Sequence, residues 1–564
     1  MFIRTKKTPR SKSISIQLVE AFRVDGKNKQ RVIRHFGTAD TKEKLELLRA
    51  LAEAMKVEIE HEQLRAKKAT SGNKYAGQFL GELQEVSDLT TLTASELEEV
   101  QRYVLGIHDV YGHVYDHLGF TNPFYNPARR VYAAKVLREI VLARIAAPDS
   151  KRASVELLEK QFGIAVNLDH VYQMMDKIED RFCSNIQNVA LATTLKLVKE
   201  KLRILFYDAT TLYFESFTED ELKQNGYSKD MKFNQPQILL ALFSTEQGLP
   251  IGYELFPGAT YEGHTLIPVL EKLKKRYQIE QLIFVADRGL LSEDNIKYLE
   301  ANNFDYIVGA RIKNMGKDLQ AKILNRDNYH ATDVGYDDKQ KLAVFDYSEN
   351  SRKLVVSYSQ KRAQKDQHDR ERSIEKLRKK LSKSKDPKSL LSNYGYKKYL
   401  EVKGDIELKV NDKKLKEDAK WDGLLGVITN VQNVPHEQIL AHYRSLWQIE
   451  ECFRINKHDL KLRPIYHWSP NRVKAHIAIS FIAFVCVRYL EYRLALQSEK
   501  LSPEVIRDSL LHVQASVIHD KKTGKDFLLP SRMNQHAKEM YRVLRIKMPE
   551  KIMQIKQSQL KCNA

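Results

Sequence analysis

Residues 204–214 read ILFYDATTLYF, and residues 282–289 read LIFVADRG. Each run is short, apolar and β-branched, which predicts a buried β-strand. One aspartate interrupts or closes each run, Asp208 in the first and Asp287 in the second. A buried carboxylate is costly unless it is paired or bound to a metal. A single aspartate at a strand end more often caps a helix or forms a salt bridge, and Asp287 could simply cap the following turn.

The sequence around these two runs predicts a mixed α/β domain. Three further strands and two helices are expected from composition and periodicity. Three strands come in hairpin succession, and strands and helices then alternate, which is the order of a ribonuclease-H-like domain. The predicted strands are 204–214, 236–244, 249–257, 282–289 and 305–312, and the predicted helices are 262–278 and 292–303.

A third acidic residue, Glu450, lies on a predicted helix at 435–460. It shares a helix face with Tyr443 and Lys457, each seven residues away, and with Leu446. The neighbouring Glu451 points about 100° away from it, and remains the alternative ligand. Carboxylates on two neighbouring strands and one helix can converge on two divalent ions, which clamp both oxygens of a phosphodiester exchange. Ligation by carboxylates alone suits Mg²⁺ or Mn²⁺.

Composition favours a nucleic-acid partner and a globular chain. The chain has 564 residues and a formal charge of +20, which favours a polyanion. Its apolar share of 42% excludes global disorder. The four cysteines are scattered without a CxxC, which argues against a disulfide framework or structural zinc and fits a reducing cytosol. No signal peptide is expected, and the apolar run 475–487 predicts a buried core helix rather than a membrane span.

The remaining segments predict several regions around this domain. Residues 154–182 have the rhythm of a helix–turn–helix with Gly163 in the turn, although such pairs also occur in proteins that never meet DNA. Arg129, Arg130, Lys151 and Arg152 could contact phosphates. A basic helix at 361–388 either tracks DNA or is a solvated surface helix. The expected regions are a basic ββα module at 1–75, a helical DNA-binding region at 95–200, the catalytic core at 201–312 and 431–495, a β-rich insertion at 313–430 and an accessory region at 496–564.

The order of Asp208, Asp287, a β-rich insertion and Glu450 resembles the DDE transposases of bacterial insertion sequences. The similarity is to the branch with a Tyr-x2-Arg-x3-Glu-x6-Lys helix, which here reads Tyr443-x2-Leu446-x3-Glu450-x6-Lys457. Leucine at 446 departs from the pattern. Further similar segments are GYSKD at 226–230, which contains Lys229, PGATYEGHT at 257–265, and KLRPIYHWSPNRVKAHI at 461–477.

The resemblance implies a metal-dependent enzyme that binds the inverted terminal repeats of its element, cleaves them and transfers the strands. It implies that Asp208, Asp287 and Glu450 hold two Mg²⁺ or Mn²⁺ ions. Double-stranded DNA, at least a homodimer at synapsis, no membrane, and a bacterial cytoplasmic, nucleoid-associated location are expected. The alternatives are a catalytically inactive repressor and a ribonuclease-H-fold endonuclease without strand transfer.

The resemblance also suggests which side chains contact DNA. Lys457 is expected beside the cut phosphate, and Tyr443 either binds a phosphate or merely packs. Arg444 or Arg454 could replace the arginine missing at 446. A flipped base can stack on an aromatic ring for about 1–3 kcal/mol, and Trp421 is favoured for this role. Trp447 is expected in the core. The expected DNA contacts are Tyr443, Lys457, Arg444, Arg454, Trp421 and Lys229.

Overall fold

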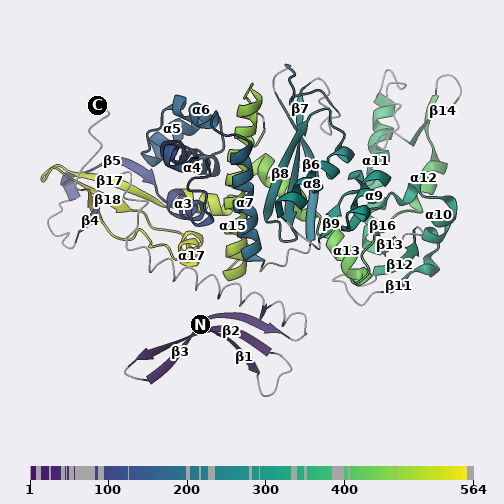
Figure 1. Cartoon of the computed structure of the whole chain (residues 1–564), viewed down its shortest axis with the longest axis horizontal. Coiled ribbons are helices and arrows are strands. Elements are labelled where there is room, and N and C mark those ends of the chain that lie inside the picture. Colours follow the sequence, from purple (N-terminus) through teal and green to yellow (C-terminus); the bar gives the residue numbers. More distant parts are fainter. Residues whose placement is uncertain are drawn as a thin grey trace.

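The computed structural model places nine strands in one central mixed sheet (Figure 1). The order across the sheet is β11-β12-β13-β16-β10-β9-β6-β7-β8. The structure describes residues 2–7, 14–24, 27–39, 45, 48–49, 52, 56, 83–86, 94–124, 126–198, 204–214, 218–226, 235–277, 282–290, 292–331, 340–347, 352–383, 399–403, 407–463 and 465–555. The sheet strands are β6 (Ile204–Tyr213), β7 (Gln237–Thr245), β8 (Pro250–Pro257), β9 (Ile283–Ala286), β10 (Asp305–Gly309), β11 (His330–Ala331), β12 (Gln340–Asp346), β13 (Lys353–Ser359) and β16 (Leu424–Thr429).

All five strands predicted around the two aspartates are present. β6, β7 and β8 form an antiparallel meander, and β9 and β10 continue the sheet in parallel with β6. β7 is buried along its whole length because both faces of the sheet are covered, which explains its unbroken apolar sequence. The helices α8 (Leu266–Tyr277) and α9 (Glu293–Ala301) follow as predicted.

Alternate residues of these strands enter two different hydrophobic cores. Phe206 and Val285 belong to a first core cluster, which is completed by the long helix α15 (Pro470–Gln497). Tyr207 and Phe284 belong to a second core cluster, which is completed by α8 and α9. Along each strand, successive residues therefore face opposite layers in turn.

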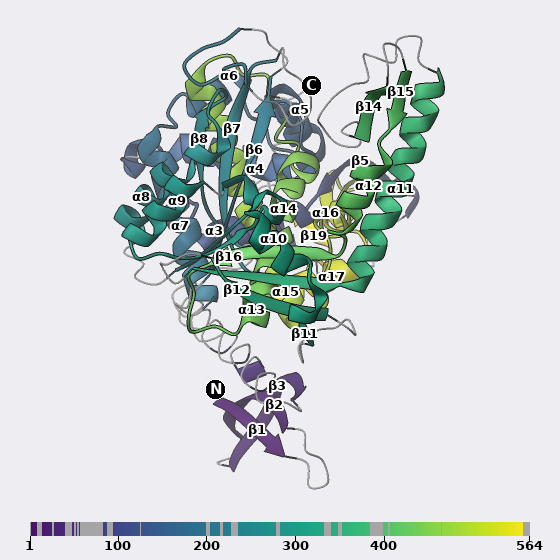
Figure 2. The ribbon, with the colours of Figure 1, turned by 90° about the vertical axis from the view of Figure 1, so that its right-hand side faces the viewer.

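Most strands expected in an insertion at 313–430 extend the central sheet, and only β14 and β15 form a separate two-stranded sheet. β16 pairs with β10, β13 with β16, and β12 with β13. The expected boundary at residue 313 is therefore not a boundary of the sheet. The elements that project from it are α11 (Gln360–Lys383), β14 (Leu400–Lys403), β15 (Glu407–Val410) and α12 (Asp412–Ala419), which lie together at one side in Figure 2. α10 (Lys317–Leu324) precedes β11.

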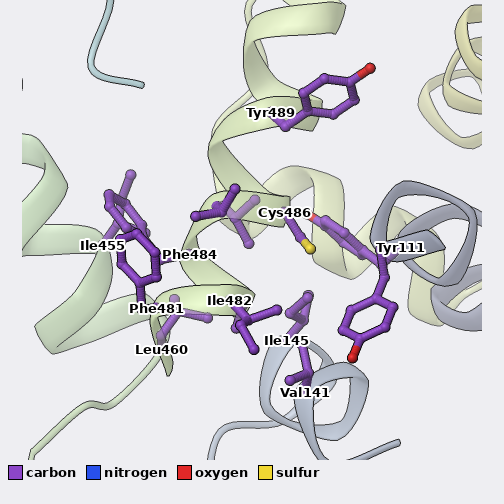
Figure 3. Close-up of a cluster of buried hydrophobic side chains, with 14 of the residues drawn as sticks. Tyr111, Val141, Ile145, Ile455, Leu460, Phe481, Ile482, Phe484, Cys486 and Tyr489 are labelled. Atoms are coloured by element: carbon purple, nitrogen blue, oxygen red, sulfur yellow. The ribbon is translucent and has the colours of Figure 1, made fainter. Parts of the chain in front are cut away.

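A helical region lies on the other side of the central sheet, and α15 joins the two. Figure 3 shows α15 side chains such as Ile482 packed toward α4, while Phe481 and Phe484 lie near Ile455. By length and composition alone α15 could cross a membrane, but 89% of its most apolar stretch is buried inside the molecule. The predicted core helix is therefore confirmed. The helices of this region are α3 (Gly106–Leu118), α4 (Val131–Ala146), α5 (Lys151–Phe162), α6 (Leu168–Met175) and α7 (Asp180–Leu197).

The predicted helix–turn–helix pair is present as α5 and α6. Gly163 ends α5 with φ of 69°, a left-handed conformation that favours glycine. The beginning of this region differs from the prediction, because residues 97–104 form the strand β5 (Leu97–Val104) rather than a helix. β5 pairs with β17 near the other end of the chain, and this non-local partner stabilises a strand that local periodicity does not indicate.

Residues near the C-terminus complete a second sheet of five strands, in the order β4-β19-β18-β17-β5. Its strands besides β5 are β4 (Leu83–Glu85), β17 (Gln514–Asp520), β18 (Lys525–Pro530) and β19 (Met553–Ile555), and its helices are α16 (Pro503–Leu511) and α17 (Gln535–Leu544). The N-terminal residues form a separate sheet of β1 (Phe2–Lys7), β2 (Ile14–Val24) and β3 (Lys27–Ala39). The β2–β3 hairpin was predicted and β1 was not. Of the helix expected in the ββα module at 1–75, the described residues 45, 48–49, 52 and 56 are helical.

Candidate active site

Asp208 and Asp287 lie side by side on neighbouring strands. β6 and β9 are parallel, and their register pairs Tyr207 with Ala286. The next residue on each chain is the aspartate, and neighbouring strands are about 4.8 Å apart. Asp208 is half-buried and Asp287 is exposed. The two carboxylates therefore leave adjacent backbones at the point where β9 ends.

Each aspartate also fixes its own turn or strand end. Oδ1 of Asp208 accepts the backbone N–H of Ala209 at 2.8 Å, and Oδ1 of Asp287 accepts that of Arg288 at 2.7 Å. The alternative role of Asp287 as a turn cap is thus real. It does not exclude a second role, because a carboxylate has about four acceptor positions.

Tyr443 reaches Asp287 from the helix α13 (His436–Arg444). Its hydroxyl lies 3.5 Å from Oδ1 of Asp287. Burial, and then the charge of Asp287, raises the pKa of Tyr443 above its ordinary value, so the phenol stays a donor at neutral pH. Gly309 makes this approach possible, because a Cβ there would stand 2.2 Å from the hydroxyl oxygen.

Lys457, at the other end of the sequence motif that begins with Tyr443, contacts β6. Its ammonium donates to Oγ1 of Thr210, which is two residues after Asp208 and therefore on the same face of the strand. Lys457 lies in a π-helical turn, Ile455–Asp459, that follows α14 (Trp447–Arg454). π-helical turns frequently occur at functional sites.

Glu450 is exposed on α14, midway in sequence between Tyr443 and Lys457. Glu450 is seven residues from both Tyr443 and Lys457, whose side chains contact Asp287 and Thr210. Glu451 is engaged elsewhere: both of its oxygens accept from Arg454 at 2.7 Å, and this lowers the pKa of Glu451. Within the described ranges, no group of three or more His, Cys, Asp or Glu side chains is close enough to hold a metal ion.

A loop held by several hydrogen bonds supports β6 and the turn after β9 from the other face of the sheet. Thr265 donates to the carbonyl of Glu262 at 2.6 Å, and its hydroxyl lies 2.5 Å from that of Tyr207, the residue before Asp208. The Asn295 amide donates to the carbonyls of Gly263 and Leu290, at 2.8 and 2.9 Å. This loop is the segment 257–265 singled out in the sequence, and it ties the Asp208 strand to the Asp287 turn.

Family models match most of the chain that carries these features. A model of the transposase DDE domain matches residues 199–486, and a model of the N-terminal domain of IS1634 family transposases matches residues 3–65. The first match alone spans just over half of the chain. The chain belongs to the DDE transposase family. It is a DNA transposase of the insertion-sequence type.

Other comparisons add little to this transposase assignment. No curated protein matches the sequence. Among solved structures, the piggyBac transposase synaptic complex with hairpin DNA gives a TM-score of 0.36 at 8% identity, covering 72% of this chain and 76% of that chain. The Mos1 paired-end complex with the left transposon end gives 0.14 at 17% identity, covering 31% and 57%. TM-scores of this size do not establish a shared fold, so family membership rests on the sequence models.

Packing explains why this transposase has leucine at position 446, where the family motif has arginine. Leu446 is 9% exposed and belongs to the first core cluster. It lies between α13 and α14, where the predicted continuous helix is interrupted. Arg444 does not turn toward this position, because its guanidinium donates to Gln340 at 2.6 Å and Ser357 at 3.3 Å, on β12 and β13.

The other aromatic and basic residues considered for DNA contact lie in different surroundings. Arg454 is bound to Glu451, as above. Trp421 is partly buried and packs against the second core cluster. The expectation that Trp447 lies in the core is wrong: it is 49% exposed at the first turn of α14, with the Lys500 ammonium 5.7 Å from its ring centre. Lys229 lies outside the described residues.

Proposed function

We propose that this transposase cleaves the terminal inverted repeats of its element and joins the freed ends to target DNA through Asp208, Asp287 and Glu450. The observation that carries the proposal is the register of β6 and β9, which sets the two aspartates side by side. The contacts of Tyr443 and Lys457 on either side of Glu450 support its inclusion.

The three carboxylates suit hard divalent cations, and we infer that they hold two Mg²⁺ or Mn²⁺ ions. Such ions, when bound, lower the pKa of a bound water and polarise the phosphodiester. The protein's own contribution is positional. Tyr443 keeps the Asp287 carboxylate oriented, and Lys457 places a positive charge beside Asp208, where a phosphate oxygen would lie.

The sheet order supports a ribonuclease-H-like core for this chemistry. An antiparallel meander is followed by two parallel strands on the side of β6, and the two aspartates lie on the first and fourth strands. We further infer that α5 and α6 contact the repeat, with Arg129 and Arg130 nearby, and that two ends are held by at least two copies of the chain. This activity would occur on the bacterial nucleoid. The mass of the protein–DNA complex tests the dimer.

The decisive experiment is cleavage of a supercoiled plasmid that carries the native flanking DNA of the gene, with Mg²⁺, followed by sequencing of the ends. Asp287→Asn should abolish cleavage at both ends. Glu450→Gln should do so as well, whereas its neighbour Glu451→Gln is the matched control and should keep cleavage, because Glu451 pairs with Arg454.

Three outcomes separate the proposal from its rivals. Cleavage and joining at two inverted repeats support it. Cleavage without joined products would indicate an endonuclease. Binding without cleavage by the wild type would indicate a repressor. Retained cleavage in Asp287→Asn or Glu450→Gln would refute the assignment of the site.

A further inference from the structure

Two aromatic side chains stand out from the segment that follows the π-helical turn. Trp468 is 76% exposed and Tyr466 is 65% exposed, while His467 between them is only half-buried and faces inward. Single exposed aromatics are normal on protein surfaces. Here two strongly exposed rings are separated by a single residue, Tyr466 and Trp468 on either side of His467.

The backbone beneath these rings is fixed. The Lys223 ammonium, 3% exposed, donates to the Trp468 carbonyl at 2.7 Å and lies 3.2 Å from Asp220. Directly afterwards Ser469 caps α15. Rings held on a rigid backbone lose little entropy when they bind a flat ligand, so Tyr466 and Trp468 are preorganised for stacking on such a ligand.

A buried cationic group lies on the inner side of the same segment. Arg144 and Lys151 are 3% and 4% exposed, and the rings of His467 and His476 are 5.4 Å apart. Nε of Arg144 and Nδ1 of His476 are buried and have no hydrogen-bond partner among the described atoms. We call Arg144 and Lys151 the cationic cluster; the adjoining rings of His467 and His476 stay neutral near pH 7, because burial lowers the pKa of each.

Arg144 donates to the backbone carbonyls of Leu460, Lys461 and Asp149, which are uncharged acceptors and do not neutralise the guanidinium. Burial lowers the pKa of Arg144 to about 10, and the exposed carboxylate of Asp149 opposes the shift only in part. Burial, and then Arg144, lowers the pKa of Lys151 well below its ordinary value. Unpaired buried charge is costly. An anion supplied from outside the protein would remove that cost.

We propose that Tyr466 and Trp468 stack on a base of the element end, and that a neighbouring backbone phosphate is attracted by the cationic cluster. This inference rests on the proposed function and concerns a different surface from the three carboxylates. Base–aromatic stacking tolerates any base, so the contact positions the DNA rather than reading its sequence.

For DNA that runs along β6, the length of the strand gives the distance of this contact from the cut. Ile465 bridges to Phe214, six residues beyond Asp208 along the line of β6, which is about 20 Å at 3.3 Å per residue. At 3.4 Å per nucleotide this is about six nucleotides. The contact should lie on the element side, because Arg472 joins this segment to α6 through Tyr172 and Asp176.

Photo-cross-linking tests the position. The full-length Asp287→Asn protein is bound to a duplex of the mapped element end, with 5-iodouracil, which cross-links to stacked aromatic rings, placed at one position after another. The yield should peak about six nucleotides inside the cut and vanish in Tyr466→Ala/Trp468→Ala. Trp468→Ala should weaken binding of the end about 5- to 150-fold, and Leu529→Ala, an exposed control on β18, should not change it.

Lys151→Met tests the cluster with two readouts of opposite sign. Replacing the buried Lys151 amine, whose charged form burial disfavours, with an apolar side chain should leave the melting temperature unchanged or raise it. Loss of phosphate attraction should weaken end binding and make it less dependent on salt. A lower melting temperature with an unchanged salt dependence would show that Lys151 is purely structural and would refute its role.

The failures of the two proposals are distinguishable. If the wild type does not retain the element end at all, both are refuted. If it binds and cleaves the end, but cross-linking peaks within two nucleotides of the cut or Trp468→Ala binds normally, only the stacking contact is refuted.

Discussion

Gly309→Ala should break the contact between Tyr443 and Asp287 without replacing either of these residues. The added Cβ would lie 2.2 Å from the Tyr443 hydroxyl oxygen and 3.0 Å from the Arg288 nitrogen. The hydroxyl must therefore retreat by roughly 1 Å or more to reach ordinary contact. Overpacking of this kind costs about 1–3 kcal/mol of stability. Loss of a hydrogen bond worth about 1 kcal/mol corresponds to about a fivefold slower cleavage.

Two further variants isolate the cause. Gly289→Ala is the matched control, because Gly289 lies in the turn that holds Asp287, but its Cβ would be 3.8 Å from the nearest neighbour, Glu262. Tyr443→Phe removes the clashing oxygen, so it should partly rescue the stability of Gly309→Ala. Urea unfolding of the four members of this cycle should give a coupling of at least about 1 kcal/mol. Additive effects, or equal losses at both glycines, would refute the explanation.

Three more predictions concern other parts of the fold. Leu446→Arg, which restores the family motif, should destabilise the protein by about 3 kcal/mol rather than activate it, because position 446 is buried; a stable, faster enzyme would contradict this. Burial raises the pKa of Asp109 to about 6 despite its bond to Tyr541, so its contribution to stability is present below about pH 4 and is lost as the pH rises through 6; urea midpoints of Asp109→Asn should lack this slope. The Arg352 hydrogen bond lowers the pKa of Glu300, so that pair stabilises the fold above about pH 4.5 and is lost in acid; Arg352→Ala should cost about 2 kcal/mol at pH 7 and little at pH 3.

The strands that carry the aspartates were predictable because their signal is local. A buried strand needs only an unbroken apolar run, and 204–214 and 282–289 provide one each. The pairing of β6 with β9 followed from the order of strands and helices. Their one-residue register, which sets Asp208 beside Asp287, is a tertiary property that no local pattern contains.

The helix that carries Glu450 was predicted in position but not in shape. The spacing of apolar residues over 435–460 fits one continuous helix, whereas the chain forms α13, α14 and a π-helical turn. Leu446 is buried at the first break, and Trp447, just after it, becomes exposed instead of entering the core. A break set by packing against the sheet does not change the local periodicity, so the sequence alone predicts a straight helix.

These breaks affect where the chain positions Glu450, the third carboxylate of the proposed site. Fourteen residues of straight helix would separate Tyr443 from Lys457 by about 21 Å, yet their side chains contact the Asp287 turn and Thr210, on neighbouring strands. Dividing the stretch lets each end approach the sheet separately, and Glu450 lies between the two anchors. Loss of either anchor should therefore misplace Glu450 while leaving the aspartates in register, so Tyr443→Phe and Lys457→Met should each resemble a partial Glu450→Gln in cleavage rate.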